Sequence, residues 1–563
     1  MKLPHFRPKI VESLKGYNKS TFGADLGAGI TVGIVALPLA MAFAIASGAP
    51  PQTGIITAVI GGFIISAFGG AKVCIGGPTG AFVIILSGIL AKFGWDGLVL
   101  CTIIAGVFLL LLGFTGLGKI IKYMPYPVTM GFTSGIAVLI MSTQVKDFFG
   151  LSVENVPSEF FEKMSVLFRA MSGISWTATL VSIGTFLFIR YWPKKLRRYA
   201  PSTIVAIIIA TLLTQLLNLP LETIGSRFGS IPTGLPMPSL PHIDWASMPS
   251  LVQPAITIAL LAAIESLLCA VVADGMVDDH HDSDQELVAQ GIANIVCPFF
   301  GGIAATSAIA RTATNVGAGA RSPVAGIIHA AVLLAILIFV APLAEFVPLA
   351  ALSAVLLNVA IHMGEWHNFR KLRTWPGSDA MVFLTAFILT VVVDLTVAVE
   401  VGVVMAALLF IKRASDTSDV SLVDSKSEEE GAHHSLVGKD IPNGVMVYSM
   451  MGSLFFGAAS KLETILERLK SEPDVLILRL RKVMSMDATG LNALVNLREK
   501  LAARGGVIVL SAPQPQPLQV MNRSGFIQKL GLENICPDID AALVRAREIQ
   551  AAKREAAQKQ AQS

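Results

Sequence analysis

Apolar positions of this 563-residue chain gather into long runs between residues 22 and 412, and Gly/Pro clusters or brief charged loops separate the runs. Most runs approach the ~20 residues that a helix needs to cross the hydrocarbon core of a bilayer. The pattern therefore predicts a polytopic α-helical membrane domain. Its fourteen predicted spans are residues 22–47, 52–69, 78–93, 97–118, 125–147, 174–191, 201–217, 251–273, 286–300, 307–319, 323–344, 346–362, 378–394 and 396–412.

Lys and Arg residues indicate how these spans are oriented. Short cytoplasmic loops of membrane proteins are enriched in both residues. With the basic N-terminal segment inside, the alternation of spans places the basic loops 119–122, 190–198 and 370–373 in the cytoplasm. The long loops 148–173 and 218–250, which are poor in Lys and Arg, then lie outside. Both termini are expected to be cytoplasmic.

The chain changes character after the last span. Residues 414–440 are acidic and polar, which is typical of a linker. Strand-like and helix-like segments alternate over residues 441–550, which predicts a small cytoplasmic α/β domain. Residues 551–563 are rich in Lys, Gln and Ala and are expected to form a disordered tail. At the other end, residues 1–21 form a short cytoplasmic segment before the membrane domain, residues 22–413.

Composition narrows the class of protein. Apolar residues make up 53% of the chain and charged residues 15%, against about 25% charged in a soluble domain. An ordinary soluble enzyme is therefore excluded. The net charge of +4 is small, and no basic run is interleaved with aromatic residues, so nucleic acid is not an expected partner. The five cysteines form no Cys-x-x-Cys pair, and no metal or cofactor is expected.

The two halves of the membrane domain carry related segments. Residues 29–32 open the first predicted span, and residues 255–258, of similar composition, open the eighth. Residues 69–80 and 301–311 are each a Gly-rich extended piece that leads into a short helix. Because the related segments lie an odd number of spans apart, the second half is inverted in the membrane. The sequence thus predicts a 7+7 inverted repeat with two broken half-helices.

Broken helices of this kind create a binding site. In secondary transporters they meet near the bilayer midplane, where non-helical backbone is tolerated only if protein shields it or it lines a wet cavity. The half-helices that begin near Pro78 and Ser307 point in opposite directions, so their N-termini face each other. Each N-terminus carries about half a positive charge and several free N–H groups. The gap between them is therefore suited to an anion.

These motifs resemble those of the SulP (sulfate permease) family, and residues 441–550 resemble the STAS domain that follows the transporter in this family. The likeness is carried by PQTGII at 51–56, GGAK at 69–72, GGPT at 76–79, AIESLL at 263–268, AIARTATN at 308–315 and GARSP at 319–323. Among the members, the chain is most similar to the bacterial branch associated with C4-dicarboxylic acids.

The resemblance implies a multi-pass protein of the bacterial inner membrane that forms a homodimer. It also implies alternating access, in which a core of spans 1–4 and 8–11 moves against a gate of spans 5–7 and 12–14. The partners expected from it are a small anion, protons, the lipid bilayer and a cytoplasmic protein that binds the STAS domain.

Glu265 is a carboxylate in the middle of the eighth predicted span. An ionisable group at that depth is costly and usually belongs to an ion or proton pathway. In the functional interpretation, Glu265 holds a proton while closed off from water and releases it when the cavity opens to the other side. The alternative is a structural carboxylate fixed by backbone donors of a neighbouring helix. Sodium-coupled relatives carry a hydroxyl one turn later, where this chain has Cys269, so sodium is not expected.

Arg311 lies one turn into the second half-helix. Its guanidinium could bind a carboxylate or sulfate through paired donors, or it could pair with Glu265. Such a pair is either structural or broken in turn by substrate and proton. The resemblance further implies that the anion cavity is lined by Phe43, Thr79, Gly80, Ser307, Ala308, Ile309 and Ala310. Without it, Phe43 is interpreted as core or lipid-facing packing, and Thr79 and Ser307 as helix caps.

Two further motifs have competing interpretations. Asp278, Asp279, His280, His281 and Asp282 resemble a metal-binding cluster, but adjacent positions seldom converge on one ion, so a solvated cytoplasmic loop is favoured. In the α/β domain, a predicted helix N-terminus would favour a phosphate on Thr489, yet Asp487 serves equally well as a cap. Capping is the preferred interpretation, with Thr489 as a candidate regulatory site.

The expected function is secondary active transport of a small anion, by proton-coupled uptake of a C4-dicarboxylate such as succinate or fumarate through alternating access. Sulfate or bicarbonate transport or exchange within the same family is the alternative. An anion channel and a STAS signalling protein with a membrane anchor belong to a different class. A channel needs a continuous polar lining, and a mere anchor needs neither broken helices nor midplane charges. The charge of Arg311 disfavours a nucleobase permease of similar architecture.

Overall fold

The computed structural model describes residues 6–118, 125–153, 156–157, 159–193, 201–239, 248–393, 395–416, 419–422, 439–455 and 473–562. The chain divides into two compact units, Met1–Ala406 and Ala407–Ser563, and the boundary falls inside helix α19 (Leu395–Asp416). The first unit therefore holds almost all of the predicted spans, and the second holds the predicted α/β domain.

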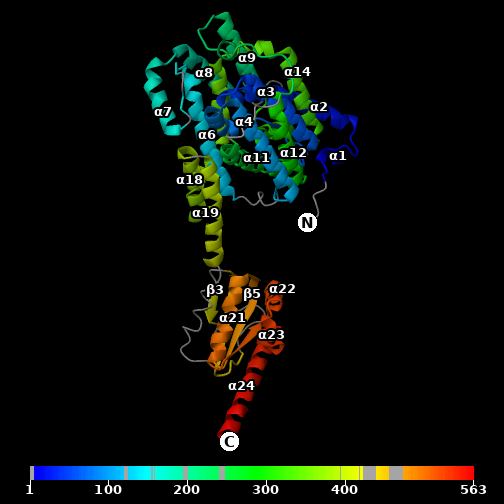
Figure 1. Ribbon diagram of the computed structural model, residues 1–563, viewed down its shortest axis with the longest axis vertical. Coiled ribbons are helices and arrows are strands. Elements are labelled where there is room, and N and C mark those ends of the chain that lie inside the picture. Colours follow the sequence, from blue (N-terminus) through cyan, green and yellow to red (C-terminus); the bar gives the residue numbers. More distant parts are fainter. Residues whose placement is uncertain are drawn as a thin grey trace. The chain divides into compact units, whose positions relative to one another are not determined.

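The first unit is built of helices and two very short strands (Figure 1). Its elements before α19 are α1 (Lys9–Ser13), α2 (Lys19–Ala46), α3 (Pro51–Phe68), β1 (Gly76–Gly77), α4 (Phe82–Thr115), α6 (Tyr126–Phe149), α7 (Phe160–Arg169), η1 (Ala170–Gly173), α8 (Trp176–Tyr191), α9 (Ser202–Leu216), α10 (Ile224–Phe228), α11 (Met248–Val277), α12 (Ser283–Val296), η3 (Cys297–Phe300), β2 (Thr306–Ser307), α13 (Ile309–Gly317), α14 (Val324–Phe339), α15 (Ala341–Ala344), α16 (Leu349–Met363), α17 (His367–Lys371) and α18 (Gly377–Val392).

Helix length separates the full spans from the shorter pieces. By length and composition, six helices in the described residues are able to cross a membrane, or seven if α7, η1 and α8 count as one bent span. The predicted spans 78–93 and 97–118 are the two arms of α4, and the break expected between them is present as a kink at Gly94, whose φ of +68° and ψ of −167° are not helical. The predicted span 307–319 is the nine-residue helix α13, which is too short to cross a bilayer.

Helices of the first unit pack in two groups. In one group α4 lies along α11 and α12, and α2 lies along α3 and α14. In the other, α6 lies along α16 and α18, and α8 packs against α9 and α16. Figure 1 shows α4, α11 and α12 side by side. Glycines permit this approach, since a Cβ on Gly106 of α4 would lie 2.8 Å from the carbonyl oxygen of Gly291 of α12.

The acidic loop after α11 anchors the N-terminal helix α1. Lys9 of α1 pairs with Asp279 at 3.1 Å. Burial alone would raise the pKa of Asp279, but the backbone amide of His280 and the Lys9 ammonium outweigh it and hold this pKa below its usual range. His281 bonds Asp274 at 2.7 Å, and the carboxylate of Asp282 caps α12. The predicted solvated loop is wrong for His281, which is 9% exposed.

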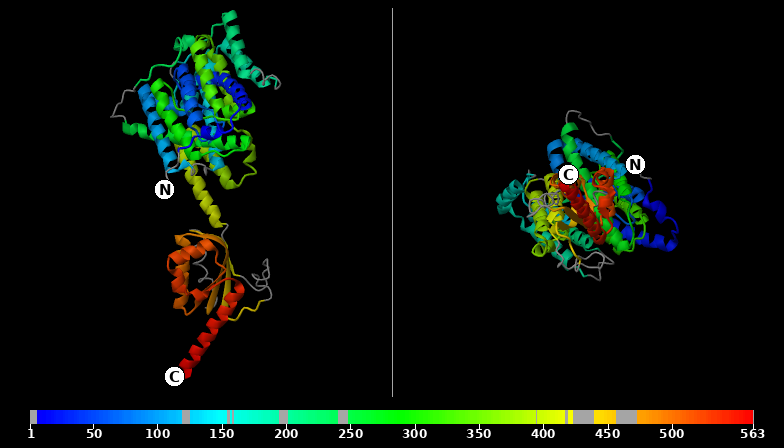
Figure 2. Two further views of the ribbon diagram at one scale, coloured as in Figure 1. Left: turned by 90° about the vertical axis from the view of Figure 1, so that its right-hand side faces the viewer. Right: turned by 90° about the horizontal axis from the view of Figure 1, so that it is seen from below.

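The second unit contains a five-stranded sheet in the order β3-β4-β5-β6-β7. The pair β3–β4 is antiparallel, and the remaining pairs are parallel. The elements after α19 are β3 (Asp419–Leu422), β4 (Val445–Leu454), β5 (Val475–Met486), α21 (Ala488–Ala503), β6 (Val507–Ser511), α22 (Pro515–Arg523), α23 (Phe526–Leu530), η4 (Leu532–Asn534), β7 (Ile535–Cys536) and α24 (Ile539–Gln562). α21, α22 and α23 cover one face and α24 the other, which buries both faces of the sheet (Figure 2).

Two boundaries differ from the sequence-based expectation. The predicted linker 414–440 contains β3, which is already part of the sheet, while residues 417–418 and 423–438 lie outside the described part. The predicted disordered tail 551–563 is helical to Gln562, as the C-terminal half of α24. Ala, Lys, Gln, Glu and Arg are strong helix formers, so this composition extends a helix that the sheet has already nucleated.

Candidate functional site

The two Gly-rich extended pieces meet as strands β1 and β2. They pair antiparallel, with Gly76 opposite Ser307 and Gly77 opposite Thr306. Each strand then leads into a helix, since α4 begins five residues after Gly77 and α13 begins one residue after Ala308. The chain is therefore non-helical at corresponding places in both halves of the first unit. The N-termini of the two half-helices therefore lie on either side of the point where β1 and β2 pair, which we call the β1–β2 crossing.

Polar side chains of α13 hold the first strand in place. The Thr312 hydroxyl accepts from the Ile75 amide at 3.0 Å, and the Asn315 side-chain amide donates to the Val73 carbonyl at 2.9 Å. The Ala308 amide donates to the Ile75 carbonyl at 3.0 Å. Buried extended backbone needs such partners because water cannot reach it. The second half of the unit thus supplies the hydrogen bonds of the first.

Arg311 belongs to the same set of contacts. Its guanidinium donates to the Gly76 carbonyl at 3.5 Å and also to the Pro78 carbonyl, and the side chain is 3% exposed. Within the described part of the chain, no hydrogen bond or ion pair joins Arg311 to Glu265. Arg311 therefore supports β1 directly through hydrogen bonds to its backbone. The positive charge of Arg311 acts on the site from behind this strand.

Gly77 is required by this arrangement. Its φ is +143°, a conformation that side chains rarely adopt. A Cβ at this position would lie 2.4 Å from Nη1 of Arg311 and 3.3 Å from Cα of Ala58, so any other residue would displace the guanidinium from the strand. Pro78, near which the first half-helix was expected to begin, lies in the extended piece before α4, and its carbonyl accepts from Arg311.

Glu265 and Thr79 meet at the edge of the crossing. Thr79 follows β1, and its hydroxyl donates to Oε2 of Glu265 on α11 at 2.8 Å. Thr79 is 7% exposed, whereas Glu265 is only partly buried. The predicted helix cap at Thr79 is not formed, because α4 has no side-chain cap. The one carboxylate that sequence reasoning singled out in this unit thus lies beside the N-terminus of the first half-helix.

Phe43 reaches the same place from α2. A Cβ on Gly80 would lie 3.2 Å from Cε1 of Phe43 and 2.9 Å from Cδ1 of Ile140 on α6, with Sδ of Met363 of α16 at 3.7 Å. Phe43 and Gly80 are therefore brought together, as the resemblance implied. Ile140 and Met363 were not singled out by the sequence, since each is one apolar residue among many. Together these side chains separate the half-helix N-terminus from the space beyond.

Ser307 is held by a buried acid that sequence reasoning missed. Its hydroxyl donates to Oε1 of Glu286 at 3.0 Å, and Glu286 also accepts from the amides of Gly70 and Ala71 at 3.0 and 3.2 Å. One turn along α12, Gln290 donates to Ser307 at 3.0 Å. Ser307 is consequently bound within a network and is 1% exposed.

A further turn along α12, Asn294 completes this polar ladder. Its side chain accepts from the Ala305 amide at 2.9 Å and donates to the Ala305 carbonyl at 2.8 Å, just before β2. This polar ladder could have been recognised in the sequence, because polar residues recur every four positions in an apolar segment, at Glu286, Gln290 and Asn294. The remaining predicted lining residues, Ala308, Ile309 and Ala310, are partly or fully exposed at the start of α13.

The regulatory candidate lies in the second unit. The carboxylate of Asp487 caps α21 by accepting from the Gly490 amide at 2.8 Å, so the capping interpretation describes the observed contact. Thr489 is exposed in the first turn of the same helix. Among the described residues, no group of three or more His, Cys, Asp or Glu side chains is placed to hold a metal ion.

Comparison with known proteins gives the family. Residues 22–386 match the Sulfate permease family, and residues 438–542 match the STAS domain. Because the first match covers more than half of the chain, the chain belongs to this family, as its motifs suggested. It is a multi-pass membrane protein that transports anions, with a C-terminal STAS domain, and it is a transporter rather than an enzyme.

Individual relatives agree. The chain is 40% identical over 522 residues to the "Putative sulfate transporter YvdB" of Bacillus subtilis (strain 168), covering 92% of this chain and 97% of that protein. It is 31% identical to the transmembrane domain of a cyanobacterium bicarbonate transporter, BicA, with a TM-score of 0.63 over 68% of this chain and 98% of that one. Murine Solute Carrier 26 family member A9 gives a TM-score of 0.84 over 96% and 94% of the chains; at 18% identity this shows the fold alone.

Proposed function

We propose that the chain carries a small oxyanion by alternating access, with the anion bound at the β1–β2 crossing and a proton carried on Glu265. The observation that carries the proposal is the meeting of two half-helix N-termini beside this carboxylate. Free N–H groups at both N-termini provide donors, and the peptide dipoles provide positive potential. The Arg311 guanidinium adds to that potential from behind the strand.

Proton coupling follows from the charges around the crossing. An anion and an ionised Glu265 would repel each other in a space shielded from water. A protonated Glu265 removes this repulsion, so anion and proton bind better together than apart. The carboxylate keeps a hydrogen bond from Thr79 in the described state, and its partial exposure leaves it reachable by water. Uptake driven by a pH gradient is the expected consequence.

Sulfate and bicarbonate are the first candidate substrates, because YvdB and BicA carry these anions in their names. A C4-dicarboxylate such as succinate or fumarate is the second candidate. The geometry that favours it is the pair of opposed N-termini, since each could receive one carboxylate. In all cases the helices around α2, α4, α11 and α12 would rock against those around α6 and α16. We further infer that the protein lies in a bacterial inner membrane as a homodimer with both termini in the cytoplasm.

The test is an uptake panel with the full-length protein in proteoliposomes. Sulfate, bicarbonate, succinate and fumarate are offered separately, with and without a pH gradient. The proposal expects one of these anions to accumulate, and to accumulate further when a gradient is applied. Uptake of several anions with an unsaturable rate would instead indicate a channel. No uptake of any of the four would contradict the substrate class.

A further inference from the structure

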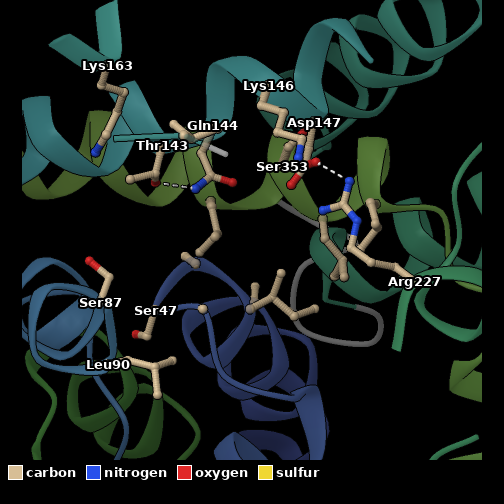
Figure 3. A pocket seen from close by; sticks show the side chains of 18 of the residues that line it. Ser47, Ser87, Leu90, Thr143, Gln144, Lys146, Asp147, Lys163, Arg227 and Ser353 are labelled. Atoms are coloured by element: carbon tan, nitrogen blue, oxygen red, sulfur yellow. Dashed lines mark hydrogen bonds and ion pairs between the residues drawn. The ribbon is translucent and has the colours of Figure 1, made fainter. Parts of the chain in front are cut away.

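A cavity lined by both polar and apolar side chains lies at the end of α2 that is remote from the N-terminal helix α1. Its volume is about 430 Å³, and α2, α4, α6, α7, α10 and α16 contribute to its wall. Figure 3 shows Ser47 and Ser87 on one side and Lys163, Gln144 and Ser353 on the other. The cavity thus lies between the two groups of helices whose relative movement the proposed function requires.

This cavity lies about one helical turn from two side chains of the half-helix site. Ser47 and Gln144, which line the cavity, are each four residues after Phe43 and Ile140, and four residues make about one helical turn. Phe43 and Ile140 are the side chains that close over Gly80. The cavity is therefore placed as a vestibule to that site, next to Phe43 and Ile140.

The charges of the vestibule are unbalanced. Three cations line it, Lys146, Lys163 and Arg227, against one carboxylate, Asp147, among the described lining residues. Arg227 pairs with Asp147 at 2.8 Å and also with Glu222. Burial alone would lower the pKa of Arg227, but these two carboxylates outweigh it and raise that pKa. Arg227, Asp147 and Glu222 together carry a net charge of −1, so the two lysines bring the whole group to a net charge of +1.

Lys163 is the unusual one among the three cations that line the vestibule. It comes from α7, in the loop expected outside the membrane, and is 4% exposed, although buried lysines are normally paired. Neither the Lys163 ammonium nor the Lys146 ammonium has a hydrogen bond or ion pair in the part of the chain that the structure describes. Burial lowers the pKa of Lys163, as expected for an ammonium without a compensating partner.

The hydroxyl groups of the vestibule are engaged elsewhere. Ser47, Ser87 and Ser353 each donate to a backbone carbonyl of their own helix. Gln144 donates to Thr143 at 2.7 Å through one of its two amide hydrogens. The donors left for a ligand therefore include the two ammonium groups, the second amide hydrogen of Gln144 and the N–H groups of Arg227 other than those on Nη2. This set of donors fits the oxygens of an anion and offers little to a cation.

We propose that this vestibule is a recruitment site for small oxyanions, at which Lys163 and Lys146 bind the substrate before the Phe43–Gly80–Ile140 layer opens. The inference rests on the proposed function, because the recruited anion is the one that is carried. Fixed cations in a cleft raise the local concentration of an anion and its rate of association, and salt weakens this effect. Recruitment should therefore affect the apparent affinity from one side of the membrane only.

The experiment compares Lys163→Met with wild type in right-side-out and inside-out vesicles, using the anion that wild type transports in the uptake panel. At low salt, the KM measured from the vestibule side should rise about tenfold, with the maximal rate and the KM from the other side unchanged. Lys163→Arg should restore the KM. The matched control is Lys92→Met, which removes an exposed lysine outside the vestibule.

An unchanged KM in a folded Lys163→Met protein overturns the proposal, as does an equal rise from both sides. If that variant does not fold, Lys146→Met takes its place. The proposal is then overturned if the KM on the vestibule side changes neither with this substitution nor with salt. Failure of the proposed function gives a different result from failure of the recruitment site, because the wild-type protein would then transport none of the four anions.

Discussion

The hydroxyl of Thr79 donates to the carboxylate of Glu265 at 2.8 Å, and this bond joins the first half-helix to α11, which belongs to the other half of the membrane unit. A carboxylate that accepts this bond is linked directly to the backbone that would bind the anion. We propose that loss or gain of a proton on Glu265 acts through this bond on the N-terminus of α4 and so couples the proton to the anion.

Arg311 is predicted to support the site through the backbone. Arg311→Ala removes the donor from the carbonyls of Gly76 and Pro78, and each buried polar group left unpaired costs about 1–3 kcal/mol. Thermal stability in detergent and transport rate should therefore fall together. Arg321→Ala, which removes an exposed arginine ten residues later, is the matched control and should change neither. A stable Arg311→Ala protein that has lost only anion affinity would instead make Arg311 a direct ligand.

Glu286 is predicted to matter for folding. Glu286→Ala leaves two backbone amides and the Ser307 hydroxyl without their acceptor, at about 1–3 kcal/mol for each group. The melting temperature of the purified protein should drop clearly. Glu286→Gln keeps an acceptor oxygen in nearly the same place and should lose less. A Glu286→Ala protein that melts with wild type would show that this network contributes little.

Gly80 is predicted to be needed for movement of the closing layer. Its Cβ in Gly80→Ala would lie 2.9 Å from Ile140 and 3.2 Å from Phe43, so these side chains must shift. We expect the initial uptake rate to fall about tenfold, equivalent to about 1.4 kcal/mol, with little loss of folded protein. Gly88→Ala, in the helix that follows Gly80 and with open space around it, is the control. Equal activity of the two variants would remove Gly80 from the mechanism.

The STAS domain is predicted to be dispensable for folding of the membrane unit. A chain that ends at Asp416 keeps α19 whole and removes β3, which belongs to the sheet of the second unit. The truncated protein should remain monodisperse in size-exclusion chromatography and keep part of its uptake activity. Complete aggregation would mean that the second unit is part of the scaffold.

Much of the site could be predicted from the sequence, because its main feature is local. Gly-rich pieces in an apolar context predict interrupted helices, and an odd number of spans between them predicts that they oppose each other. The paired strands β1 and β2 confirm this meeting. Glu265 is also a local signal, because a single ionisable residue within an apolar run can be recognised without knowing which residue it contacts.

The remainder depended on contacts between distant residues. Arg311 lies 235 residues after Gly76, and periodicity gave no way to choose between an anion, Glu265 and the backbone as its partner. Glu286 lies near the start of its predicted span, where a charge is unremarkable, although it binds Gly70, 216 residues earlier. The helical tail was missed for another reason. The polar composition of residues 551–563 was interpreted as disorder, although the same residues have high helix propensity.

Glu265→Gln tests the central claim most directly. The variant keeps the side-chain shape and an oxygen that can accept from Thr79 but cannot carry a proton. In proteoliposomes loaded to give a pH gradient, wild type should accumulate its anion above the level reached without a gradient. Glu265→Gln should reach the same level with and without it, while still exchanging anion across the membrane. Gradient-driven accumulation that survives in Glu265→Gln would contradict the account.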